Sequence, residues 1–144
     1  KAPAVIARAH HGSVSKEQRA QVERTPQPTG HGPERVHTVV RTLVGLYTGE
    51  LFRAALHAWT AAAADENVRE VITPLERRFA RSVHTTAVAH LDVDDSDPHV
   101  RTLIQATLDL ARGLALADLL TDDSKRRRRI VRAWSDVLAG ELCP

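Results

Sequence analysis

The sequence contains no methionine, a single cysteine and only five aromatic side chains among 144 residues. The lone cysteine, Cys143, excludes a framework of intrachain disulfides and is typical of a reducing compartment, so we predict a cytoplasmic location. The lack of methionine predicts that the sequence is a piece of a longer chain. With so few aromatic residues, a core must be built from alanine, leucine and valine.

Long apolar runs and a strong net charge are also missing. No apolar stretch reaches the roughly 20 residues of a membrane span and no signal peptide is visible, so we expect no membrane partner. A net charge of +2 is too small to indicate nucleic-acid binding by the whole chain. Arginine far outnumbers lysine, which is typical of proteins from GC-rich bacterial genomes.

The motifs of common catalytic and metal sites are absent as well. One glutamate, Glu34, is followed three residues later by a histidine, His37, whereas the di-iron sites of helical bundles require such a pair on each of two facing helices, and His84 and His90 are six residues apart. The sequence has no glycine-rich phosphate loop, no His-Glu-x-x-His motif and no Gly-x-Ser-x-Gly elbow. These absences predict no bound metal, no cofactor and no enzymatic activity.

Helical signals fill the remaining sequence, and no segment alternates with the period of a strand, so we predict an all-α fold. Every expected helix except 34–47 begins at a capping residue: Ser15 with Gln18, Thr48, Asp65, Thr73 with Pro74 and Glu76, Asp97, and Asp122 to Ser124. A linker rich in proline and glycine covers residues 25–33. The expected helices are 16–24, 34–47, 50–64, 66–72, 74–91, 98–120 and 124–142.

The segment 98–120 is apolar around most of its circumference. At about 100° per residue, its charged and amide side chains, such as Arg101, Gln105 and Asp109, form one narrow stripe. One apolar flank can face the core of the same chain, and we expect a second copy of the helix to cover the other. The alternative is a central helix of a monomeric bundle.

Two other features have a structural and a functional interpretation. The basic run at 125–129 points all around a helix axis, which favours a solvated collar over a stripe that binds nucleic acid. It also opposes the helix dipole, so it indicates surface or partner use. The large aromatic residues Phe52, Trp59 and Phe79 either fill the core or line a pocket among small side chains.

Three blocks of sequence together resemble the C-terminal regulatory domain of TetR-family transcriptional repressors: Leu51 to Trp59, Pro74 to Arg78, and Leu108 to Leu116. The resemblance runs from about Pro33 to Gly140. It implies a C-terminal helical bundle whose last two long helices form a dimeric four-helix bundle, with an effector pocket enclosed by the preceding helices. Similar sequences often carry an acid where His57 stands and an arginine where Ala63 stands.

The resemblance also implies a domain division and a set of partners. Residues 1–32 are expected to be a remnant of, or a linker from, an N-terminal DNA-binding region, and residues 33–144 the ligand-binding and dimerisation domain. The partners are a second copy of the chain, operator DNA bound through a helix-turn-helix headpiece, and an apolar small-molecule effector. The sequence identifies no DNA-contacting residue. His10 and His11 have only a faint similarity to the end of a DNA-reading helix.

Two sets of candidate site residues follow. The expected effector pocket is lined by Val40, Leu43, Phe52, Leu56, His57, Trp59, Phe79, Val83, His84, Thr107, Ala111 and Arg112. The expected dimer interface contains Leu103, Leu110, Leu114, Ala117, Ile130, Trp134, Val137 and Leu138. The competing functions are a helical enzyme that uses the same cavity, a helical protein that binds a small molecule without DNA, and a purely structural dimer.

Overall fold

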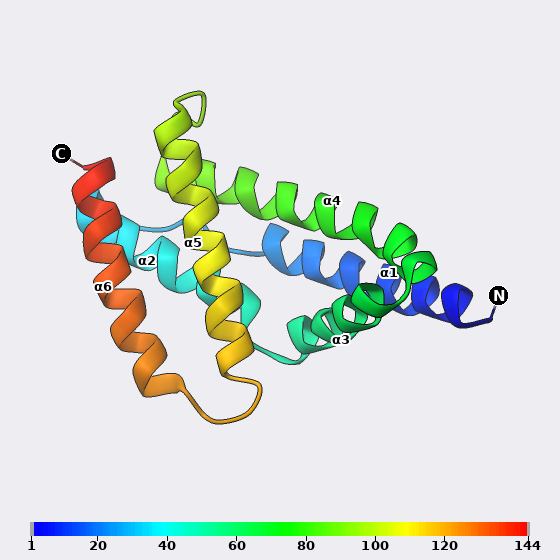
Figure 1. The fold of residues 1–144 in the computed structure, drawn as a ribbon. Coiled ribbons are helices and arrows are strands. Elements are labelled where there is room, and N and C mark those ends of the chain that lie inside the picture. Colours follow the sequence, from blue (N-terminus) through cyan, green and yellow to red (C-terminus); the bar gives the residue numbers. More distant parts are fainter. Residues whose placement is uncertain (1, 144) are drawn as a thin grey trace. The chain divides into compact units, whose positions relative to one another are not determined.

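The computed structural model describes the backbone of residues 2–143 and the side chains of residues 12–143, and it is helical throughout (Figure 1). Between residues 2 and 143 there is no strand, which confirms the all-α class. Residues 2–143 form six helices: α1 (Ala2–Glu23), α2 (Gly32–Tyr47), α3 (Glu50–Ala64), α4 (Glu66–Leu91), α5 (Pro98–Ala117) and α6 (Ser124–Leu142). None of these helices is long and apolar enough to cross a bilayer.

The chain forms two compact units that interleave along the sequence. The first unit contains α1, α3 and α4 as far as Val83, and the second contains α2, the end of α4 from His84, α5 and α6. The boundary that we predict after residue 32 divides the chain by function, into a remnant of a DNA-binding region and a ligand-binding and dimerisation domain. It stays a prediction.

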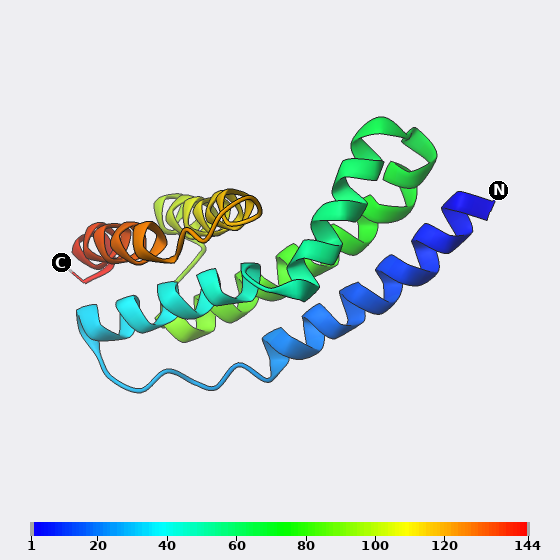
Figure 2. The same ribbon diagram turned by 90° about the horizontal axis from the view of Figure 1, so that it is seen from below.

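In the first unit, α1 packs along α3 (Figure 2). A small apolar cluster then holds the turn between α3 and α4: Ala62, Val68 and Ile72 are buried, with Ala58 and Trp59 packed against them. Asp65 stabilises this turn as predicted, because its carboxylate accepts hydrogen bonds from the backbone N–H groups of Asn67 at 2.9 Å and Val68 at 3.4 Å.

The predicted start of a helix at Ser15 is wrong, because α1 already begins at Ala2. Ser15 and Gln18, which we interpreted as a capping box, are both buried in the middle of this helix. They share one side of α1 with Val14 and Val22, at spacings of three and four residues. The histidine pair at residues 10 and 11 has side chains outside the described residues.

The predicted break between Ile72 and Thr73 is also wrong, because α4 is continuous from Glu66 to Leu91 with Pro74 inside it. A proline in a helix interior removes one hydrogen bond and crowds the preceding turn. Ile72 and Phe79 are both buried, one on each side of the proline. Burial on both sides outweighs the local signal for a new helix start.

Replacing Thr73 by alanine distinguishes a continuous helix from a capped one. In a continuous α4, alanine has the higher helix propensity, so the free energy of unfolding should stay level or rise by up to about 0.7 kcal/mol. A cap at Thr73 would make the variant about 1 kcal/mol less stable.

Pro74→Ala restores a donor for the Glu70 carbonyl and should stabilise the chain by about 1 to 3 kcal/mol. Urea unfolding measures both variants, and a loss of stability in both would contradict the continuous helix.

In the second unit, α5 and α6 run beside each other and both pack on the same side of α2 (Figures 1 and 2). The buried side of α2 carries Val36, Val39, Val40, Leu43 and Val44. The end of α4 is attached to α2 by a hydrogen bond of 2.6 Å from the Arg35 Nε–H to the His90 carbonyl.

The remaining helix ends agree with the sequence in part. Asp97 caps α5 as predicted, because its carboxylate accepts a hydrogen bond of 2.8 Å from the His99 N–H. Thr48 does not cap α3; its hydroxyl donates to the Gly45 carbonyl at the end of α2, and Gly49 is the residue before α3. The helix expected to reach residue 120 ends at Ala117, which leaves Leu120 exposed in the following turn.

Candidate functional site

The residues predicted to line one effector pocket are divided between the two units. Phe52, Leu56, Phe79 and Val83 are buried in the first unit. Val40, Leu43, Thr107 and Ala111 are buried in the second, where α2 packs against α5. The sequence therefore identified two buried sets of residues.

Of the polar pocket candidates, His57 is exposed on α3. His84 is half-buried, and its Nε2 lies 3.1 Å from Asp95 Oδ2 in the second unit. Arg112 forms an ion pair with Asp109, and its guanidinium carbon lies 5.7 Å from the centre of the Tyr47 ring. His84 and Arg112 thus already have partners in the chain.

The interior of the first unit combines aromatic rings with polar groups that lack a partner. Phe52 and Trp59 meet edge to face, with ring centres 5.5 Å apart and planes at 87°. Among the described residues, nothing hydrogen-bonds to the buried amide oxygen and nitrogen of Gln18 or to the indole N–H of Trp59. A buried polar group without a partner costs roughly 1 to 3 kcal/mol, so these atoms are suited to bind a polar group of a ligand.

Gln18 is a site candidate that the sequence reasoning missed. Its side chain is 2% exposed. The available signal was the spacing of Val14, Gln18 and Val22, which places a glutamine between two valines on one side of a helix. We assigned Gln18 to a helix cap, where an amide has a local partner, so its burial was not expected.

A hydrogen-bonded contact joins α5 to α6 in the second unit. The Trp134 indole N–H donates to the Thr107 hydroxyl at 2.9 Å, and that hydroxyl donates to the Leu103 carbonyl at 2.8 Å. Thr107, expected in the pocket, is buried under this contact. The bond fixes Trp134 to α5, while the ring itself stays half-buried.

His90 is the one buried histidine among the described side chains. Burial lowers the pKa of its imidazole, and the positive charge of Arg35 lowers it further. A histidine whose pKa falls on folding stays neutral in the folded state while the unfolded chain takes up a proton. The free energy of unfolding should therefore decrease as the pH falls below the ordinary histidine pKa of about 6.5.

This behaviour of His90 can be checked directly. An NMR titration of the His90 ring should show a midpoint below the ordinary pKa of about 6.5, whereas a midpoint at or above that value would contradict the burial. In a His90→Gln variant, this contribution to the pH dependence of unfolding should disappear.

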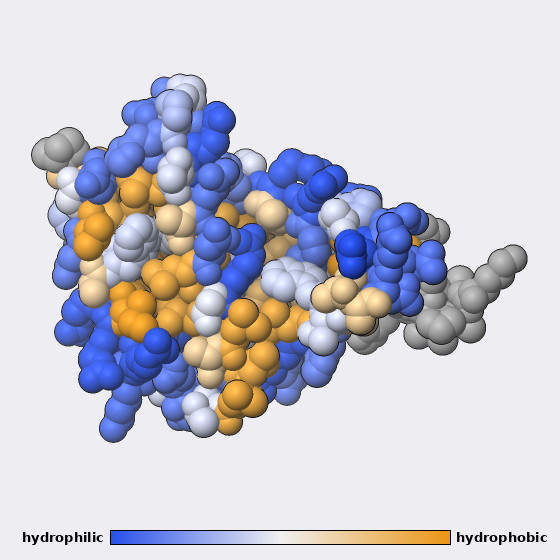
Figure 3. All heavy atoms as spheres, viewed as in Figure 1, coloured by the Kyte–Doolittle hydropathy of each residue, from blue (hydrophilic) through white to orange (hydrophobic). Residues whose placement is uncertain are grey.

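An apolar surface covers the sides of α5 and α6 that face away from α2. Figure 3 shows hydrophobic residues gathered over these two helices. We call this surface the α5–α6 face. Its members are half-buried or exposed and follow the helical period along each helix: Leu103, Leu110, Ala117, Ile130, Trp134 and Val137. All six belong to the predicted dimer interface.

The other two predicted interface residues require a correction. Leu114 and Leu138 are only 4% and 0% exposed in the single chain. They lie next to the α5–α6 face around each helix, on the flank that also carries Ala111 and Ser135, where both helices pack within the second unit. Their side chains fill the interior and present no surface to a partner.

Within residues 12–143, no three or more histidine, cysteine, aspartate or glutamate side chains are placed to hold a metal ion. Comparisons of the chain with protein-family models, with curated proteins and with solved structures find no match.

Proposed function

We propose that this chain is the effector-sensing and dimerising part of a bacterial transcriptional repressor of the TetR type. The observation that carries the proposal is the α5–α6 face. Val137 is 55% exposed on this face, and Leu110 and Trp134 are half-buried members of it. Large contiguous apolar surfaces on soluble proteins mark interaction sites, and a helix pair pressed against its own copy gives a four-helix bundle with two-fold symmetry.

In this proposal, the dimer couples an effector to operator DNA. The two chains pair through α5 and α6 in the cytoplasm, and each carries a DNA-reading headpiece connected through its N-terminal region. An effector that binds one arrangement of the chains more tightly shifts the population toward it. The affinity for the operator then falls by the corresponding coupling free energy.

We place the effector in the first unit, where buried polar atoms lie among apolar side chains. The Gln18 amide offers one donor group and one acceptor, and the Trp59 indole offers a donor. Phe52 and Phe79 supply apolar surface in the same unit. The expected effector is therefore a largely apolar small molecule with one hydrogen-bonding group, in which burial provides most of the affinity and the polar contacts provide selectivity.

Trp134 reports on the proposed dimer, because it lies half-buried on the α5–α6 face. In a Trp59→Phe background it is the only tryptophan, and its emission should shift to longer wavelength as the protein is diluted from micromolar to nanomolar concentration. The matched control is Trp134→Phe, in which Trp59 should show no shift. A Trp134 emission spectrum that does not change with concentration and is typical of a solvent-exposed indole would refute the dimer.

A further inference from the structure

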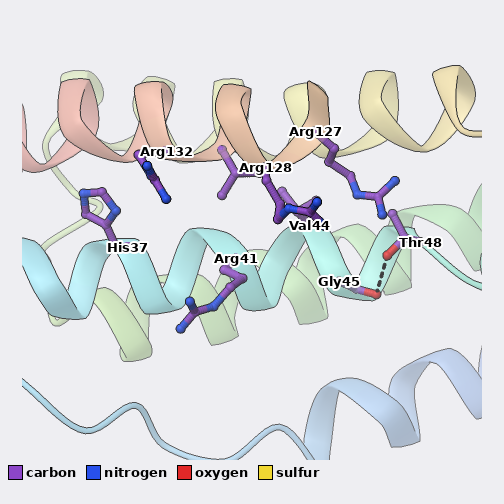
Figure 4. Close-up of a pocket in the computed structure, with 9 residues that line it drawn as sticks. His37, Arg41, Val44, Gly45, Thr48, Arg127, Arg128 and Arg132 are labelled. Carbon is purple, nitrogen blue, oxygen red and sulfur yellow. Dashed lines mark hydrogen bonds between the residues drawn. The ribbon is translucent and has the colours of Figure 1, made fainter. Parts of the chain in front are cut away.

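A groove between α2 and α6 is lined mainly by basic side chains, with a cavity of about 320 Å³. Figure 4 shows Arg127, Arg128 and Arg132 extending from α6 into the space above α2. His37 rises from α2, while Arg41 lies along α2 with its guanidinium turned away from α6. Val44, Gly45 and Val131 provide the less polar part of the lining.

Two of the basic groups in this groove already have an acidic partner. His37 Nε2 lies 2.7 Å from Asp136 Oδ1. Arg127 Nη1 lies 2.9 Å from Asp118 Oδ1, an ion pair whose angle falls outside hydrogen-bond geometry. These pairs place carboxylates at the edge of the groove, and the Asp118 carboxylate offsets the positive charge of Arg127.

The other three arginines leave an excess of positive charge. Among the described side chains, none forms a hydrogen bond or ion pair with Arg41, Arg128 or Arg132. Arg128 and Arg132 are spaced by four residues and therefore lie on one side of α6, about 6 Å apart along its axis. A second cavity, which also contains Lys125 and Arg129, adjoins the same two arginines.

Local stability does not explain these cations. Arg128 and Arg132 lie beyond the first turn of α6 and Arg41 lies in the middle of α2, so the helix dipoles favour none of them. Two guanidinium groups directed at one cavity also repel each other unless an anion lies between them. Arginine binds phosphate oxygens through two parallel N–H donors, which favours phosphoryl groups over monovalent anions.

We propose that the groove between α2 and α6 binds a small molecule that carries at least two phosphoryl groups. Arg128 and Arg132 hold the phosphoryl oxygens, and Arg41 adds a third charge when its flexible side chain turns into the groove. The non-ionic part of the ligand rests on Val44 and Val131. This site is separate from the apolar effector site in the first unit and does not depend on it.

Inorganic pyrophosphate is the probe, titrated calorimetrically into the full chain at low ionic strength because surface charges are screened by salt. We expect one pyrophosphate per chain with a dissociation constant below about 1 mM, a level that two charge-assisted contacts support. Arg128→Gln and Arg132→Gln should each weaken binding by about tenfold or more. Glutamine is a good helix former, and both positions are exposed, so the variants should fold.

Two further variants separate a built site from general attraction of anions. Arg81→Gln removes an exposed arginine from α4 in the first unit and should leave pyrophosphate binding unchanged. Gly45→Gln leaves every charge in place but adds a side chain beside the cavity, where a Cβ meets no atom within 4 Å. It should weaken binding without destabilising α2.

Three results would overturn the proposal. The first is no heat of binding at millimolar pyrophosphate. The second is an equal loss of affinity in Arg81→Gln, or no loss in Gly45→Gln, because either would mean that the charge of the surface alone attracts the anion. The third is a short DNA duplex that binds more tightly than pyrophosphate and depends on Arg128 and Arg132, which would assign the groove to nucleic acid.

Discussion

Replacing Val137 by arginine should convert a dimer of this chain into monomers. Val137 is 55% exposed in the single chain, so the arginine costs the folded monomer little. In a paired α5–α6 face, the same change buries a charge without a partner on each side of the two-fold axis, at a cost of several kcal/mol. The dissociation constant of the dimer should rise at least about a hundredfold.

Leu116→Arg is the matched control for this prediction. Leu116 is 53% exposed, almost the same as Val137, but at 100° per residue it lies about 120° around α5 from Leu110 and outside the α5–α6 face. Sedimentation of the two variants at equal concentration should give monomers for Val137→Arg and native association for Leu116→Arg. Equal behaviour of the two variants would show that the face does not mediate association.

Replacing Gln18 by methionine should stabilise the chain in the absence of an effector. The buried amide has no hydrogen-bond partner among the described residues, and methionine has a similar shape without the polar atoms. Removing an unpaired buried amide should raise the free energy of unfolding by about 1 to 3 kcal/mol. In our proposal, the chain keeps Gln18 because the amide binds the effector, and the free chain is less stable as a result.

Urea unfolding of Gln18→Met and of Gln105→Met tests this prediction. Gln105 is exposed on α5, so its replacement should change the free energy of unfolding by no more than about 0.5 kcal/mol. A loss of stability in Gln18→Met would mean that the amide is hydrogen-bonded in the folded chain. The effector site would then lose the polar group on which it depends.

Local signals predicted most helix positions but failed where packing decides. The bounds of α3 follow from its apolar spacing and the residues around it, and Asp97 marks the start of α5. Thr73 and Pro74 gave the clearest local start signal in the chain, yet α4 continues through them, because burial at Ile72 and Phe79 outweighs one lost hydrogen bond. A capping rule considers only four residues and takes no account of such burial.

The candidate sites show the same limit. The apolar period predicted six residues of the α5–α6 face, but it could not distinguish Leu114 and Leu138, because the side of a helix that faces its own chain depends on neighbours distant in sequence. Likewise, the basic run at residues 125–129 predicts a collar around one helix. Only the placement of α2 beside α6 selects Arg127 and Arg128 from this run and adds Arg132 as lining residues of one groove.

The central claim is that the α5–α6 face joins two copies of this chain. Sedimentation velocity of the unmodified protein at micromolar concentration measures its mass directly. The proposal predicts a species of twice 15.8 kDa, held by an interface that buries upwards of about 2,000 Å² in total. A single species of 15.8 kDa at these concentrations would contradict the dimer, and with it the proposed repressor.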